Sequence, residues 1–177
     1  MRAPSPPSAT ERPTGWWARL WRRIEPSISE PIPQIATAEL RQQHERLRTR
    51  LEALRCMLSH DSGGLDATQL HQALNELRGL LGEHFIAEDY LLYPALLHSE
   101  SSEVAKLARQ FQAELGCLAQ RFERFCTHWS GTEKIRASPA AFNAEGRVLI
   151  EALLNRITLE DQTLYSAADR CSAARRL

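Results

Sequence analysis

The chain has no net charge, because its 22 basic residues are matched by 22 acidic ones. A balanced charge creates no overall attraction to nucleic acid, so no nucleic-acid partner is expected. No apolar run approaches the roughly 18 residues that a membrane-spanning helix needs. Glycine is scarce, with 8 residues, and aromatic residues make up only 7% of the 177. These low values argue against an all-β or repeat-rich fold.

The four cysteines carry no recognisable motif. None of them belongs to a C-x-x-C pair or to a zinc-ligand spacing, and they are Cys56, Cys117, Cys126 and Cys171. The sequence also shows no signal peptide. Both observations favour reduced thiols in a cytoplasmic protein, which is the location we expect.

Proline is concentrated at one end of the chain. Seven of the nine prolines lie within residues 1–35, where they exclude a long helix or a central strand. The same segment contains Trp16, Trp17 and Trp21 in a short basic stretch. We predict a Pro-rich tail whose tryptophans either cover an apolar edge of the main domain or bind a protein partner or a membrane surface.

Beyond the tail, apolar residues recur every three or four positions, which is the spacing of amphipathic helices. The pattern predicts four long helices, over residues 37–60, 67–97, 102–129 and 139–169. Helices of this length with short connections predict an all-α fold, an antiparallel up-down-up-down four-helix bundle.

Residues at the expected helix ends support this assignment. Asp66 and Ser138 stand where N-caps are expected. Pro94 should kink or end the second helix, because proline cannot donate a helical hydrogen bond. The bundle should occupy residues 36–170, and residues 171–177 should form a C-terminal tail.

Five polar residues interrupt the apolar stripes, and they are His44, His84, Glu88, Glu114 and Glu160. A rise of about 1.5 Å per residue places all of them in one layer of the bundle. Carboxylates buried there repel one another unless they keep their protons or share a cation. Bundle cores that bind paired iron or manganese ions use inward carboxylates and histidines in this way. We therefore predict a metal site built from these five residues.

The same residues also have structural interpretations. His84 and Glu88 are spaced as a simple intrahelical pair, and Glu114 could extend to the rim of the bundle. Glu160 could pair with Arg156, one turn earlier on the same helix. Only the convergence of these residues in one layer favours a metal site over the structural interpretations.

Three segments resemble the hemerythrin-like (HHE cation-binding) domain family. One surrounds His44, in Gln43–Leu47, and the second, Glu83–Pro94, reads H-x-x-x-E followed by L-Y-P. The third, Arg156–Tyr165, echoes the second in the fourth helix. The resemblance spans about residues 36–170 and implies a non-heme di-iron site bridged by Glu88 and Glu160. It also implies binding or sensing of dioxygen, nitric oxide or peroxide, or iron handling.

The sequence departs from the family pattern in two helices. Arg156 stands where the fourth-helix motif usually has histidine, and Phe111 or Glu114 takes the histidine positions of the third helix. A site with fewer histidines and more carboxylates favours manganese or ferritin-like iron chemistry over reversible oxygen carriage. Alternatively, the charge of Arg156 replaces one cation, and the site then holds one metal or none.

Three functions follow from these observations. The leading one is a cytoplasmic iron-binding protein, with two ions expected, that senses oxygen, nitric oxide or redox state or handles iron. The second is a metal-free helical-bundle interaction module with a degenerate site. The third is a di-iron peroxide-reducing oxidase with Glu114 or Tyr93 near the metals. No organic substrate pocket is indicated, so an enzyme is least expected and no catalytic residue is assigned.

Overall fold

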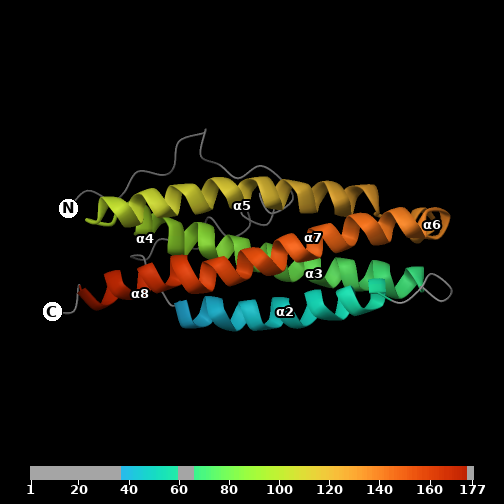
Figure 1. Cartoon of the computed structure of the whole chain (residues 1–177), viewed down its shortest axis with the longest axis horizontal. Coiled ribbons are helices and arrows are strands. Elements are labelled where there is room, and N and C mark those ends of the chain that lie inside the picture. The colour runs from blue at the N-terminus through green and yellow to red at the C-terminus, as the bar shows by residue number, and fades with distance from the viewer. Residues whose placement is uncertain (1–36, 60–65, 175–177) are drawn as a thin grey trace, which may run out of the picture.

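The computed structural model describes residues 37–59 and 66–174, and every regular element within these ranges is helical. The prediction of an all-α fold is confirmed for this part of the chain. Figure 1 shows long helical rods lying side by side. The predicted tail, with its three tryptophans, lies outside the described residues.

Each rod contains one or more of the helices that Figure 1 labels. The first rod is α2 (Thr37–Ser59), and the third is α5 (Ser102–His128). The second and fourth rods each contain a five-residue π-helical turn. They are composed of α3 (Ala67–Ala87), η2 (Glu88–Leu92) and α4 (Tyr93–Leu97), and of α7 (Pro139–Leu159), η3 (Glu160–Leu164) and α8 (Tyr165–Ala174).

The helix starts follow the capping residues of the sequence. The Asp66 carboxylate accepts hydrogen bonds from the backbone N–H groups of Thr68 and Gln69. Ser138 occupies the N-cap of α7, although its side chain makes no capping hydrogen bond. Two differences from the predicted boundaries appear further along the chain. A short helix, α6 (Thr132–Ala137), precedes the fourth rod, and α8 continues to Ala174 instead of ending at residue 169.

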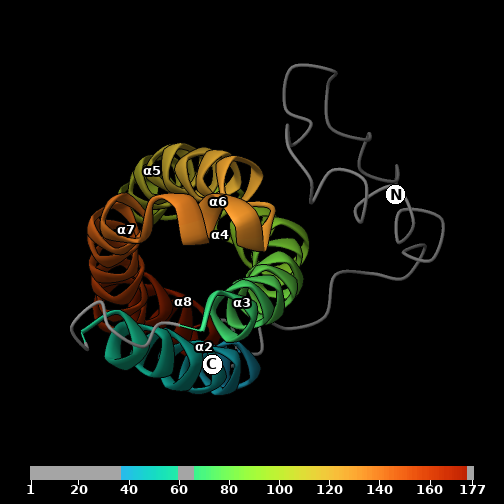
Figure 2. The same ribbon diagram turned by 90° about the vertical axis from the view of Figure 1, so that its right-hand side faces the viewer.

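The four rods form a ring around one apolar core, seen end-on in Figure 2. α2 packs against α3 and α7, while α5 packs against α4 and α7. Leucine dominates the fully buried side chains, together with two phenylalanines and two tyrosines: Leu47, Leu51, Leu58, Leu70, Leu77, Leu81, Leu92, Leu96, Phe122, Phe142, Tyr93 and Tyr165.

The π turns shift the buried face of their rods by one residue. A regular spacing would place Leu91 and Ala95 inside, but both are only partly buried. Leu92, Tyr93 and Leu96 form the core face instead. Inserted residues of this kind are frequent at functional sites in helices.

Pro94 does not end the second rod. It falls in the first turn of α4, directly after the π turn, and the rod continues to Leu97. Proline is tolerated at the first turn of a helix because no helical partner is lost there. The π turn therefore accommodates Pro94.

Two further observations concern the described residues. None of their helices is both long and apolar enough to cross a membrane. All four cysteines lie among these residues, and none of them forms a disulfide.

Candidate metal centre

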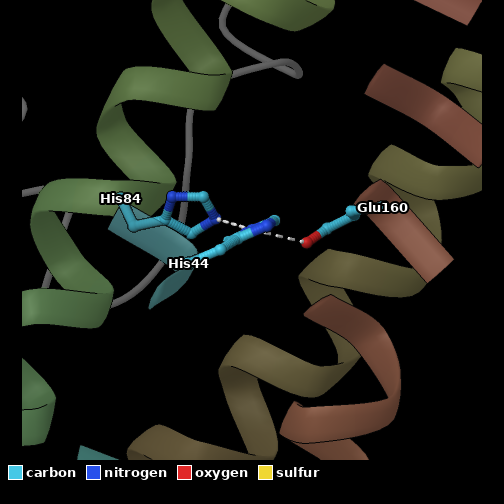
Figure 3. Close-up of side chains that lie close together, drawn as sticks. All are labelled: His44, His84 and Glu160. Atoms are coloured by element: carbon cyan, nitrogen blue, oxygen red, sulfur yellow. Dashed lines mark hydrogen bonds and ion pairs between the residues drawn. The ribbon is translucent and has the colours of Figure 1, made fainter. Parts of the chain in front are cut away.

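Three ligand atoms from three different elements meet in the core. They belong to His44 on α2, His84 on α3 and Glu160 at the start of η3, and all lie within 4.8 Å of one another. The His44 Nε2 atom is 3.1 Å from His84 Nε2 and 3.3 Å from Glu160 Oε2. Figure 3 shows the three side chains converging from separate rods. Each residue is at most 2% exposed.

Both histidines are held so that their Nε2 atoms face the cluster. His44 Nδ1 donates to Asp161 Oδ1 over 2.8 Å, and His84 Nδ1 donates to Gln43 Oε1 over 3.0 Å. A neutral imidazole that donates from Nδ1 presents a lone pair at Nε2. Outer partners of this kind orient the histidine ligands of metals.

The two Nε2 atoms therefore form an acceptor pair that needs a cation. Two lone pairs that face each other at 3.1 Å repel unless a proton or a metal ion lies among them. Burial lowers the pKa of His84 to about 3, so this ring stays neutral near pH 7.

Glu88 adds a carboxylate to the same region. It is fully buried, and its Oε2 atom has no hydrogen-bond partner. The Nε2 atom of the neutral His84 ring lies 3.8 Å from that oxygen. Burial raises the pKa of Glu88 well above its usual value, and the nearby charge of Glu160 raises it further. A buried carboxylate oxygen that has no hydrogen-bond partner and lies near an imidazole fits a bound cation.

Arg156 occupies the opposite side of the cluster. Its Nε donates to Glu160 Oε1, and its Nη2 donates to Tyr93 Oη over 3.1 Å and to the Phe111 carbonyl over 2.9 Å. The guanidinium also lies over the Phe111 ring, 4.5 Å from its centroid. Arg156 is 7% exposed, so its charge is placed in the core.

The two central carboxylates consequently differ. Burial favours the neutral form of Glu160, but the neighbouring His44 and the charge of Arg156 oppose it and lower the pKa on balance. Glu160 stays ionised while Glu88 holds its proton more tightly. One carboxylate already has an internal cation, and the other has none.

Glu114 does not join the other four predicted residues. Its side chain is 53% exposed, and its only contact with the site is to Arg156 Nη1, 3.4 Å from Oε2. The core face of α5 is formed by neighbouring positions instead, namely Ala108, Phe111, Leu115 and Leu118. Glu114 therefore lies one position off that face, at the rim.

Three supporting residues were not among the predicted site residues. Gln43 and Asp161 immediately adjoin a predicted ligand, being next to His44 and Glu160 in the sequence. Tyr165 lies against the cluster, and its hydroxyl donates to Glu88 Oε1 over 2.8 Å. Adjacency in sequence was the available signal for the first two, whereas only the π turn brings Tyr165 inward.

The donor set matches a first-row transition metal. Two imidazole nitrogens with carboxylate oxygens bind iron, manganese and related ions, and two histidines with one carboxylate are typical of non-heme Fe(II). Thiolates, which typify many structural zinc sites, are absent from this cluster of described residues. The residues present therefore fit iron.

A family model described as "Hemerythrin HHE cation binding domain" matches residues 36–168. This range includes His44, His84, Glu88 and Glu160, together with Gln43 and Asp161. Comparison with curated proteins and with solved structures gave no match.

Proposed function

The chain belongs to the hemerythrin HHE cation-binding domain family, and we propose that it binds one iron ion with His44, His84, Glu88 and Glu160. The observation that carries this proposal is the pair of Nε2 atoms 3.1 Å apart, with both rings oriented from Nδ1 and with Glu160 beside them. We also propose that the four rods form the antiparallel up-down-up-down bundle that the sequence predicts.

Arg156 favours one ion over the expected two. A bridging Glu160 would need both oxygens for metals, but Oε1 accepts a hydrogen bond from the Arg156 guanidinium. The guanidinium also brings a fixed positive charge into the region where a second ion would lie. We therefore propose that this arginine replaces the second ion of the di-iron arrangement. Manganese fits the same donors, and metal analysis distinguishes the two.

The burial of the donors supports a sensing role. The four ligand residues are 0–2% exposed, so the site suits a diatomic molecule or peroxide better than an organic substrate. The open pocket of about 570 Å³ lies elsewhere, between α5 and α7, and contains none of the donors. Iron bound here would supply one-electron redox chemistry and affinity for small ligands. We propose sensing of dioxygen, nitric oxide or redox state, in the cytoplasm, where reduced thiols are expected.

Metal content tests the proposal directly. Protein expressed in iron-supplemented medium and purified without a metal-affinity tag should contain about one iron per chain by elemental analysis. His84→Ala should lose most of it. His71→Ala is the matched control on the same helix, because His71 instead contacts the Ser130 carbonyl at 2.9 Å. Protein that has no iron or manganese, and takes up neither when supplied, would contradict the proposal.

The metal-free interaction module is the second candidate, and the hydrogen bonds of the two carboxylates favour it. Glu160 is paired with Arg156, and Glu88 accepts a hydrogen bond from Tyr165. For such a module, chelation should leave the melting temperature unchanged and added iron should not raise it. A bound ion requires the opposite, because a ligand that binds only the folded state stabilises that state.

A further inference from the structure

We propose that the phenol oxygen of Tyr165 is a fifth ligand of this ion. The inference rests on the proposed metal site and concerns its donor set. Tyr165 is fully buried at the start of α8, directly after the π turn that Glu160 begins. Its ring stacks on His44, with centroids 5.0 Å apart and an interplanar angle of 13°, so its hydroxyl is fixed beside the donors.

The distances around His44 support a common coordination shell. Tyr165 Oη lies 3.2 Å from His44 Nε2, and the other two neighbours of that nitrogen lie at 3.1 and 3.3 Å. Ligands at right angles on one ion, with bonds of about 2.1 Å, are separated by about 3.0 Å. Each of the three neighbours thus lies at a distance from His44 Nε2 that two adjacent ligands of one ion would have.

The hydrogen-bonding pattern also leaves the phenol oxygen available. Tyr165 donates its proton to Glu88 Oε1 over 2.8 Å, so the oxygen presents lone pairs to the cluster. With a neutral His44 that donates from Nδ1 to Asp161, its Nε2 atom faces acceptor atoms of His84, Glu160 and Tyr165. Several acceptor atoms that face one another without a donor between them can be satisfied by a metal ion.

Burial, together with the charges of Glu88 and Glu160, raises the pKa of Tyr165, so the phenol keeps its proton in the metal-free protein. Coordination would break the phenol O–H bond as the metal–oxygen bond forms, and the proton would be released to solvent, as is usual when protonated ligands bind metals.

Tyr93 provides a matched control. Each tyrosine lies five positions after the glutamate that begins a π turn, and both are fully buried. Tyr93 Oη, however, accepts a hydrogen bond from Arg156 Nη2 at 3.1 Å and makes no contact with either histidine among the described interactions. Removal of its hydroxyl should leave the ion's ligands in place.

The experiment compares the wild-type protein, Tyr165→Phe and the double variant Y90F/Y93F, in which Tyr165 is the only tyrosine of the chain. Each protein is loaded anaerobically with Fe(II) and oxidised with ferricyanide, which takes one electron and becomes ferrocyanide. After desalting, the visible spectrum and resonance Raman spectrum are recorded, with iron content per chain. Ferric phenolates show a visible charge-transfer band whose excitation enhances phenolate ring modes.

We expect the band and the ring modes in wild type and in Y90F/Y93F, and their loss in Tyr165→Phe. The double variant keeps the test decisive even where Tyr165→Phe loses its iron. Wild-type protein with one iron per chain and no band would overturn the role of Tyr165 and leave the proposed iron site intact. A band that persists in Tyr165→Phe would also overturn it. Wild-type protein that binds no iron would overturn both proposals.

Discussion

Replacement of Arg156 by histidine should raise the number of bound metal ions from one to two per chain. Histidine at this position stands four residues before Glu160, as His84 stands four residues before Glu88. The substitution removes the fixed charge of the guanidinium and supplies a neutral nitrogen ligand in its place. It also releases Glu160 Oε1, which accepts a hydrogen bond from Arg156 in the structure.

Arg156→Met is the matched control, because it removes the charge without supplying a ligand. The side chain of Arg156 is 8% exposed and makes hydrogen bonds with Glu160, Tyr93 and the Phe111 carbonyl. Removal of one partner of a buried ion pair costs about 3–5 kcal/mol, because the other charge is left without compensation. In the presence of a chelator, Arg156→Met should lose about that much of its free energy of unfolding. The double variant R156M/E160Q should recover a large part of it.

Urea denaturation in chelator measures the stability, and elemental analysis with equilibrium dialysis measures the stoichiometry. The expected pattern is one ion in wild type, two in Arg156→His and no gain in Arg156→Met. Two ions in wild-type protein would refute the reasoning that Arg156 replaces a cation. So would an Arg156→Met protein as stable as wild type in chelator, since the ion pair would then contribute nothing.

Three further predictions concern other residues of the structure. Glu88→Gln should abolish most metal-dependent stabilisation. It should nevertheless stabilise the metal-free protein near pH 7, because burial raises the pKa of Glu88 and makes its ionised form costly. The gain in free energy of unfolding over wild type, measured by urea denaturation, should shrink as the pH falls toward about 4.5. Asp161→Asn should weaken metal affinity about 10- to 100-fold in a chelator competition, because the carboxylate orients His44, a proposed ligand. Glu45→Gln, at an exposed carboxylate, should leave the affinity unchanged. Cys126 should be alkylated only on unfolding, because it is buried and its pKa is raised to about 12. The exposed Cys117 should react in the native protein, and peptide mass spectrometry would distinguish the two sites.

Most of the fold and of the candidate donor set could be predicted from hydrophobic periodicity. His44, His84, Glu88 and Glu160 were identifiable because each interrupts an apolar stripe at a core position, and the structure brings these four together. Glu114 was assigned from the same rule on α5, yet it is exposed. That helix buries alanine at several positions, and small side chains left the register of its stripe ambiguous by one residue.

The remaining parts of the site depend on geometry that a regular helical repeat does not contain. A period of 3.6 residues per turn, extended past Glu88 or Glu160, predicts the wrong inward residues. Tyr93 and Tyr165 reach the core only because each follows an inserted residue. The hydrogen bonds of Gln43 and Asp161 cross between rods, so no pattern within one helix could reveal them.

The two π turns also change the rotational orientation of the helices that follow them in their rods. One extra residue rotates everything beyond it by about 100° relative to an uninterrupted α-helix. Deletion of a single residue from η2 or η3 would make the helix more regular, yet it would turn the apolar faces of α4 or α8 toward solvent. The exposed positions Gln162 and Thr163 tolerate substitution in principle, but their number is fixed. The fold therefore constrains the length of these turns more than the identity of their exposed residues.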